Sequence, residues 1–381
     1  MPLSHRERVI KTLRHQEPDR IPFDLGGTMC SSIHVAGYQK LKAHFGVEDE
    51  DTIIHKFMQT AGVHEPILRA LDVDFRFVRS CGPDSRPDTP VGGNGYQDEY
   101  GVVRRQPSSA LYYDLIKSPL AGPITIQDIV NFPWPDPGDP GYTRGFRQQL
   151  SDWRENTDYA VVTRLPTPIV HLSQFLRGFE DWFIDLAADQ KLAAAMFDAV
   201  VEHTSAIAAE ILKAGGDLVD VVLVGEDMGF QNGPIISPEL YRRLFKPRHK
   251  KFFDTVKKHT SAFVLLHSCG SIYKLLPDII ELGVDAINPV HVAARDMDSS
   301  MLGSEFGDRL SFWGGIDTQR VLPNGTPEEV KAEVRRRIRD LAPGGGYVLA
   351  AAHNIQPDVP VENILAMFEA GREYGRYPIN L

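Results

Sequence analysis

The chain has 381 residues, of which 42% are hydrophobic and 24% are charged, an ordinary balance for a globular protein with a large core. A formal net charge of −10 at pH 7 argues against a nucleic-acid-binding surface, and no apolar run approaches the roughly 20 residues that span a bilayer. Three cysteines without a C-x-x-C pair exclude a disulfide framework. Because the polar N-terminus lacks a signal-peptide core, we expect a cytoplasmic protein with reduced thiols.

The N-terminal part of the chain is predicted to be irregular. It begins with a helix, a turn at Pro18 and Asp19, and a first strand near Ile21–Leu25. The segment 78–106 is rich in Gly, Pro and Asp, which is typical of hairpins or loops over one end of a barrel. Its GGNG run lacks the spacing and flanking elements of a dinucleotide-binding fingerprint. We interpret FPWPDPGDPG, residues 132–141, as a rigid connector.

From about residue 159 onward, short apolar runs alternate with segments of helical period. The six runs are 159–165, 217–224, 262–266, 286–290, 310–315 and 346–352. Helices are predicted after Ser237 and after Thr326, each of which is an N-cap followed by proline. Such alternation indicates parallel strands, and the number of units favours a (β/α)8 TIM barrel. We expect a single barrel domain over 1–381, with loop insertions in about 1–140 and regular strand–helix units in about 141–381.

Polar side chains follow five of the predicted strands at their carboxyl ends. They are Glu226 and Asp227, then His267 and Cys269, then His291, then Asp317 and Gln319, and finally His353, Asn354 and Gln356. The carboxyl ends of parallel barrel strands all face one mouth, where such barrels carry out their chemistry. This density of polar groups argues against a non-catalytic barrel that only binds or regulates.

His267 and Cys269 form the pattern H-x-C directly after a predicted strand. Residues i and i+2 of an extended chain point to the same side, so this imidazole and thiol would share a space suited to zinc. They could instead simply pack in the core. His353 would be a third ligand or an acid/base that acts on the substrate. Glu226 and Asp227 point to opposite sides, so only one is expected in the site, and Glu226 could close a tetrahedral shell.

Roles can then be assigned to the remaining groups. Catalytic roles are predicted for Glu226, Asp227, His353 and Asn354. Substrate contacts are predicted for His171, His291, Asp317, Gln319 and Gln356, although packing explains His171 equally well and a plain loop position explains His291 slightly better. Cys30 and Cys81 have no His or acidic neighbours in the sequence and are interpreted as structural or incidental. The basic run 246–258 is interpreted as the solvated face of a helix.

Several motifs together resemble the uroporphyrinogen decarboxylase superfamily, and specifically its cobalamin-dependent methyltransferase branch. They are DRIPF (19–23), GPIISPELYRRLFKPRHK (233–250), HSCG (267–270), LSFWGGIDTQ (310–319) and HNIQPDVPVENILAMFEA (353–370). The resemblance implies a (β/α)8 barrel with its active site at the carboxyl-end mouth. The decarboxylases carry an arginine motif, R-Q-A-G-R, where this chain has FDLGGTMCSSIH (23–34). Decarboxylation of a porphyrinogen is therefore not expected.

The methyltransferase branch binds zinc through H-x-C and a later cysteine, at whose position this chain has His353. The HNIQ form is most similar to the methyltransferases that act on methyl ethers in O-demethylation. The resemblance implies that zinc polarises the ether oxygen of a small methylated substrate and that the methyl group passes to Co(I) of cobalamin. Because the corrinoid-binding pattern D-x-H-x-x-G is absent, the cobalamin is expected on a separate corrinoid protein. Family analogy also suggests a homodimer.

Two other enzymatic readings stay open at this point. In the first, zinc activates the thiol of a small acceptor, which then takes the methyl group from methyl-cobalamin. In the second, the protein is a metal-free decarboxylase or lyase that uses His353 and Asp227 as acid and base.

Overall fold

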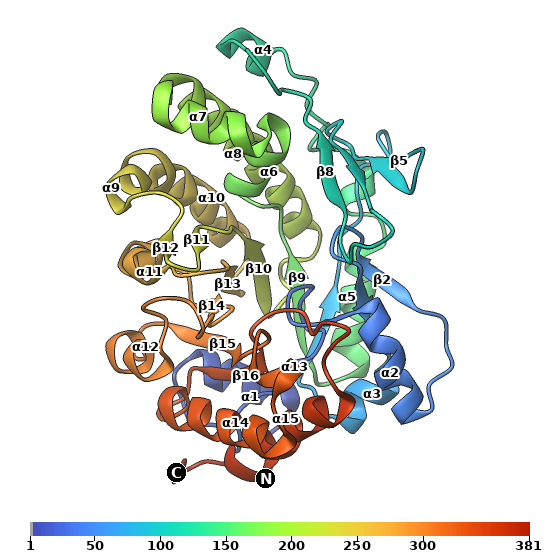
Figure 1. Ribbon diagram of the computed structural model, residues 1–381, viewed down its shortest axis with the longest axis vertical. Helices are drawn as coiled ribbons and strands as arrows, with labels where there is room; N and C mark the ends of the chain where they lie inside the picture. Colours follow the sequence, from blue (N-terminus) through green and yellow to red (C-terminus); the bar gives the residue numbers. More distant parts are fainter. Residues whose placement is uncertain (1–2) are drawn as a thin grey trace.

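The computed structural model describes residues 3–381 and contains a parallel sheet curled into a barrel with helices around it (Figure 1). In spatial order the seven strands are β16 (Tyr347–Ala351), β15 (Ser311–Ile316), β14 (Ala286–Asn288), β13 (Phe263–His267), β10 (Val221–Gly225), β9 (Ala160–Arg164) and β4 (Phe75–Val78). All neighbouring pairs are parallel. Each of the apolar runs predicted as strands from residue 159 onward is confirmed.

The stretch from Pro22 to Asp24 closes the barrel. On the free side of β16, Leu349 N donates to Pro22 O and Leu349 O accepts from Asp24 N, each at 2.9 Å. On the other side, Asp74 N, at the start of β4, donates to Phe23 O at 3.0 Å. This stretch therefore occupies the eighth position, where the sequence predicted a first strand, and the predicted α/β barrel is confirmed.

Alternate side chains of the strands fill the barrel interior. They are Phe75, Ala160, Val162, Val221, Leu223, Leu265, Ala286, Trp313, Val348 and Ala350, all buried in one cluster. Helix α1 (His5–Leu13) packs Val9 into this cluster and covers the amino-terminal end. At the same end, buried Asp74 pairs with Arg8 and Arg20. Helix α1 and these ion pairs therefore cover the amino-terminal end, and the cavity described below lies at the carboxyl-end mouth.

The outer layer consists of helices that cover the strands. They are α5 (Phe146–Asn156), α8 (Gln190–Gly215), α10 (Lys246–His259), α11 (Leu276–Glu281), α12 (Ser299–Phe306), α14 (Pro327–Leu341) and α15 (Val361–Tyr374). Helix α8 is long and apolar enough to cross a membrane, but 67% of its apolar window is buried inside the protein. It packs against α10, as a core helix does.

The helix predicted after Ser237 is present but interrupted. Ser237 Oγ accepts the Leu240 N–H, and α9 (Pro238–Leu240) continues through a π-helical turn, Tyr241–Phe245, into α10. Pro247 has no N–H to donate to the preceding turn, and a wider turn accommodates this loss. The helix predicted after Thr326 is confirmed as α14, with a reciprocal capping box between Thr326 and Glu329.

Shorter elements surround the mouth. A four-stranded antiparallel sheet, β5 (Thr89–Val91), β6 (Gly95–Gln97), β7 (Val103–Arg105) and β8 (Asp114–Lys117), confirms the hairpins predicted for 78–106 and lies beside the mouth (Figure 1). The remaining strands are β1 (Ile33–His34), β2 (Thr52–His55), β3 (Thr60–Gly62), β11 (Gly229–Phe230) and β12 (Gly233–Pro234). The remaining helices are α2 (Val35–Phe45), α3 (Glu65–Ala70), α4 (Ile126–Val130), α6 (Val170–Arg177), α7 (Phe179–Ala188) and α13 (Val321–Asn324).

Candidate metal and substrate site

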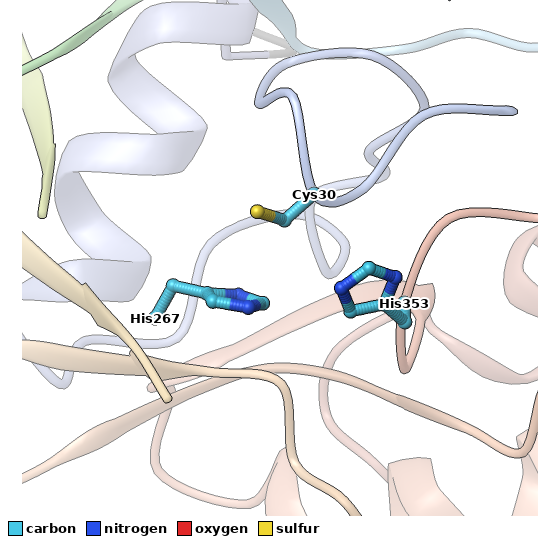
Figure 2. Close-up of side chains that lie close together, drawn as sticks. All are labelled: Cys30, His267 and His353. Atoms are coloured by element: carbon cyan, nitrogen blue, oxygen red, sulfur yellow. The ribbon is translucent and has the colours of Figure 1, made fainter. Parts of the chain in front are cut away.

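Five side chains with metal-binding groups meet at the carboxyl end of the barrel. The ligand atoms of Cys30, His267 and His353 lie within 4.8 Å of one another, and so do those of Asp227, His267 and Cys269. Figure 2 shows the first three side chains directed into one space from separate parts of the chain. His267 belongs to both groups and joins them.

His267 is held in one orientation by a buried amide. It ends β13, where alternation places it in line with the interior residue Leu265. Its Nδ1 lies 2.6 Å from Asn288 Oδ1, and Asn288 Nδ2 donates to Trp313 O at 3.1 Å. Because this amide presents its oxygen to the ring, Nδ1 carries the proton and the Nε2 lone pair faces the group. Nε2 lies 3.5 Å from Cys269 Sγ.

Cys30 reaches the site on a tightly bonded loop. Asp24 accepts hydrogen bonds from Gly27 N and Trp313 Nε1, each at 2.7 Å, which fixes the loop to the barrel. A Cβ at Gly27 would lie 2.5 Å from Asp24 Oδ1, so only glycine fits there. Farther along, Ser32 N donates to Asn354 Oδ1 at 3.1 Å. The thiol is therefore presented by a rigid loop rather than by a strand.

The donor set and its spacing fit a tetrahedral zinc ion. Zinc takes thiolate sulfur at about 2.3 Å and imidazole nitrogen at about 2.0–2.1 Å, so two such ligands on one ion lie about 3.6 Å apart. The 3.5 Å between His267 Nε2 and Cys269 Sγ matches this separation. Cys30 and His353 would complete a set of two sulfurs and two nitrogens, with Asp227 beside it.

Electrostatics at the site favour a cation. Burial lowers the pKa of His267, but the thiols of Cys30 and Cys269 raise it by more, so the pKa lies well above its usual range. Burial raises the pKa of Asp227, yet the hydrogen bond and charge of His171 and the charge of His267 leave it well below its ordinary value. A divalent ion would take the place of the positive charge that these groups attract.

His353 and His171 differ in protonation. Burial, followed by the charge of His267, lowers the pKa of His353 to about 4, so its imidazole is neutral at pH 7 and can act as a ligand. Burial also lowers the pKa of His171, but Asp227, whose Oδ2 lies 3.4 Å from its Nε2, raises it overall. His171 and Asp227 thus form a close pair at the edge of the donor group, in which the carboxylate favours the protonated form of the imidazole.

A cavity of about 710 Å³ opens over the donor group. Cys30, Asp227, His267 and His353 line it on the barrel side, and His171 lines it from α6. The antiparallel sheet of the N-terminal part forms the opposite wall, which includes Tyr96 of β6. This volume suits a small organic molecule. The cavity brings such a molecule to the metal-binding groups.

Glu226, predicted as a metal ligand and catalytic residue, lies elsewhere. It is fully buried, and its Oε1 accepts hydrogen bonds from Ile169 N and Val170 N, both at 2.8 Å, and contacts His249 Nε2 at 3.0 Å. The interior positions of β10 run through Val221, Leu223 and Gly225 to Asp227, so Glu226 points outward to the start of α6. The structure therefore corrects the choice between the two adjacent carboxylates.

Several other predicted site residues also lie apart from the cavity. Asn354, predicted as catalytic, is buried and holds the Cys30 loop, with its Nδ2 donating to Thr60 Oγ1 at 3.1 Å. His291, Asp317, Gln319 and Gln356, predicted as substrate contacts, do not line this cavity. They bond to neighbouring loops: His291 accepts the Gly270 N–H, Asp317 caps the turn at Gln319, and Gln356 donates to Tyr112. His171 does line the cavity.

Cys30, interpreted from the sequence as structural or incidental, lies in the donor group with His267 and His353. Cys30 follows the predicted first strand, Ile21–Leu25, as His267 follows the predicted strand 262–266. The rule that collects polar groups at strand ends would therefore have included it. Cys81 also lines the cavity, but it is exposed and belongs to neither group of metal-binding residues.

The profile of the uroporphyrinogen decarboxylase (URO-D) family matches residues 145–374, more than half of the chain. The chain belongs to the URO-D family. Among its relatives, methylcobamide:CoM methyltransferase MtbA of Methanosarcina mazei is 24% identical over 379 residues, 97% of this chain and 98% of that protein. Methylcobamide:CoM methyltransferase MtaA of Methanosarcina barkeri is 26% identical over 219 residues, so the match spans 57% of this chain but only 59% of that relative.

A solved structure of a methyltransferase from Methanosarcina mazei has the same fold. It superposes with a TM-score of 0.67 at 17% sequence identity, over 98% of this chain and 99% of that one. These comparisons confirm the predicted superfamily and its corrinoid methyltransferase branch. Zinc, the methyl-ether substrate and the homodimer stay predictions.

Proposed function

We propose that this protein is a zinc-dependent methyltransferase that moves a methyl group from a small methylated molecule, with methyl ethers as the favoured class, to Co(I) of a corrinoid on a separate protein. The observation that carries the proposal is the donor group of Cys30, His267, Cys269 and His353, of which Cys30, His267 and His353 line a cavity large enough for an organic substrate. The URO-D relatives described as methylcobamide:CoM methyltransferases support the corrinoid.

In this proposal the side chains hold and orient rather than react. Zinc, when bound, withdraws electron density from the ether oxygen as a Lewis acid. The corrinoid would supply the Co(I) nucleophile that accepts the methyl group, and the electron pair of the C–O bond would stay on the leaving oxygen. Asn288 keeps His267 Nε2 free for the ion, and the Cys30 loop closes the ligand set from the opposite side. His171, which lines the cavity beside Asp227, would donate a proton to the oxygen that leaves.

The test compares two cysteine variants with a matched control. Cys30→Ala and Cys269→Ala should each lose most of the bound zinc, whereas Cys81→Ala, a thiol on the same cavity outside the donor group, should keep about one ion per chain. Transfer is followed by the absorbance change when cob(I)alamin is methylated by a methyl ether. Full transfer by the zinc-free protein would contradict the proposal.

A second direction of transfer is favoured by the names of the relatives. Both MtaA and MtbA are described as methylating CoM, a thiol. In that case the same donor group would hold the acceptor's thiolate, and methyl-cobalamin would supply the methyl group. Consumption of methyl-cobalamin on addition of coenzyme M, with no methylation of cob(I)alamin by methyl ethers, would select this alternative.

A further inference from the structure

Arg164 is a half-buried cation in the cavity wall, and its buried Nε lacks a hydrogen-bond partner among the described residues. It is the last residue of β9, where alternation from the interior residues Ala160 and Val162 turns its side chain into the mouth. Its Nε is fully buried and has no hydrogen-bond partner in the part of the chain that the structure describes. A buried guanidinium is costly unless an anion or acceptors compensate it.

Elsewhere the protein compensates its buried arginines. Ion pairs with carboxylates are formed by Arg8, Arg76, Arg104, Arg177 and Arg337. Arg164 differs from them because it forms no ion pair with a carboxylate among the described residues, whereas Arg104, whose Nε also lacks a partner, is paired with Asp98. Because Arg164 lines the cavity rather than the core, an anion that enters from solvent can reach it.

A second guanidinium lies next to it. The parallel register pairs Val78 with Thr163, so the next residue along each chain places Arg79 beside Arg164. Arg79 donates only one hydrogen bond, from Nη1 to Ile54 O at 2.9 Å. His55 is close by, and burial together with the charges of Arg164, Arg79 and Arg104 lowers its pKa well below the usual value. This corner therefore carries an excess of positive charge.

The acidic groups nearby do not remove this excess. Asp98 is already paired with Arg104. Burial, followed by the charge of Asp98, raises the pKa of Glu99 to about 7, so Glu99 is only half-ionised at neutral pH. Burial lowers the pKa of Arg164 below its ordinary value, and the charge of Arg79 lowers it further. Cys30 and Glu99 raise this pKa by less than the total lowering. The charged form of Arg164 thus lacks full compensation.

The corner and the donor group belong to one cavity with an aromatic wall. Cys30, His267 and Arg164 all line it, and β9 and β13 flank β10 in the sheet. Phe57 and Phe175 line it too, with ring centroids 6.1 Å apart. Such a wall takes the flat or apolar body of a ligand.

We propose that the small-molecule substrate is an organic anion whose carboxylate or sulfonate binds Arg164 and Arg79. Its apolar body lies along Phe57 and Phe175, and its reacting group, the methyl ether or in the reverse direction the thiol, faces Cys30 and His267. This inference rests on the proposed methyl transfer for the reacting group, but the anion site stands on its own geometry. Arg164 and Arg79 thereby select charged substrates over neutral ones.

The test measures binding to the zinc-loaded protein by calorimetry, without corrinoid. The ligands are 3-methoxybenzoate, its neutral amide 3-methoxybenzamide, and coenzyme M, a thiol that carries a sulfonate. Arg164→Gln should weaken binding of the charged ligands about 10-fold or more and leave the amide unchanged, and Arg164→Lys should restore part of the loss. Arg144→Gln is the matched control, since Arg144 lines the same cavity but pairs with Asp84.

The outcomes separate the two proposals. The anion site would be overturned if the wild type and a folded Arg164→Gln protein bound charged ligands equally well, or if no charged ligand bound at all. Either result would leave methyl transfer from a neutral ether intact. Arg164-dependent binding without methylation of cob(I)alamin or of the thiol would uphold the anion site and refute the proposed function. The preferred ligand, benzoate or sulfonate, identifies which anion the site takes.

Discussion

Asn288 is the residue through which the proposed metal site can be tested without touching a ligand. Its side chain is fully buried, accepts the Nδ1 proton of His267 at 2.6 Å and donates to Trp313 O at 3.1 Å. Asn288→Ala removes the acceptor. The imidazole proton is then no longer held on Nδ1, and a proton on Nε2 blocks the lone pair that would bind the metal.

The expected loss follows from this single hydrogen bond. Removing an outer partner of a metal-binding histidine weakens metal affinity by about 10- to 100-fold, or about 1.4–2.7 kcal/mol. Because a buried amide is also lost, the free energy of unfolding should fall by about 1–3 kcal/mol. Asn288→Asp keeps the acceptor for His267 and should retain most of the zinc affinity.

Zinc affinity is measured by competition with a chromophoric chelator at constant pH. The control is Asn363→Ala, another buried amide, which donates to Leu322 O and Gly325 O at the end of α13 rather than to a residue of the donor group. Asn363→Ala should lose stability to a similar degree but bind zinc normally. If Asn288→Ala and Asn363→Ala bound zinc equally well, His267 would not depend on Asn288 and the reasoning would be refuted.

Three further predictions address other parts of the structure. Glu226→Ala leaves two backbone N–H groups at the start of α6 without an acceptor, so the free energy of unfolding measured by urea titration should fall by about 2–5 kcal/mol. The zinc content per folded chain should stay unchanged, and a loss of zinc in the folded variant would restore Glu226 as a ligand. Burial lowers the pKa of His203 from 6.5 to about 4, so protonation of this histidine favours the unfolded chain. The free energy of unfolding should therefore fall by up to about 3 kcal/mol as the pH drops from 6.5 to 4, and a His203→Gln protein with the same pH dependence would disprove this. Glu99, with a pKa of about 7, becomes negatively charged near Arg164 as the pH rises, so 3-methoxybenzoate should bind more weakly at pH 8 than at pH 6. Glu99→Gln should abolish this difference, and an unchanged pH profile in that variant would show that Glu99 does not cause it.

Local sequence signals predicted the barrel and part of its site. The apolar runs, the caps at Ser237 and Thr326 and the H-x-C pattern depend on neighbours a few residues away, and all of them stand in the structure as predicted. The strand-end rule singled out His267, Cys269 and His353, and the structure brings their side chains to the same donor group. It did so because parallel strands necessarily bring their carboxyl ends to one mouth.

The choice between Glu226 and Asp227 shows where local signals end. Alternation along a strand separates two faces, but it does not say which face is interior, and a shift of one residue exchanges them. Packing of Leu223 against the opposite strands sets this phase in β10, so Asp227 enters the mouth and Glu226 turns to α6. Only the closed barrel decides it.

Long-range contacts decided the rest of the site. Cys30 joins His267 and His353 because Asp24, Asn354 and the barrel hold its loop over the mouth. Arg164 stands out only when its surroundings are known, since a charged residue at a strand end is unremarkable in a sequence. The sequence by itself thus determined which elements form and which end of them carries chemistry. The tertiary structure decided which side chains share one cavity, because that depends on groups brought together from distant parts of the chain.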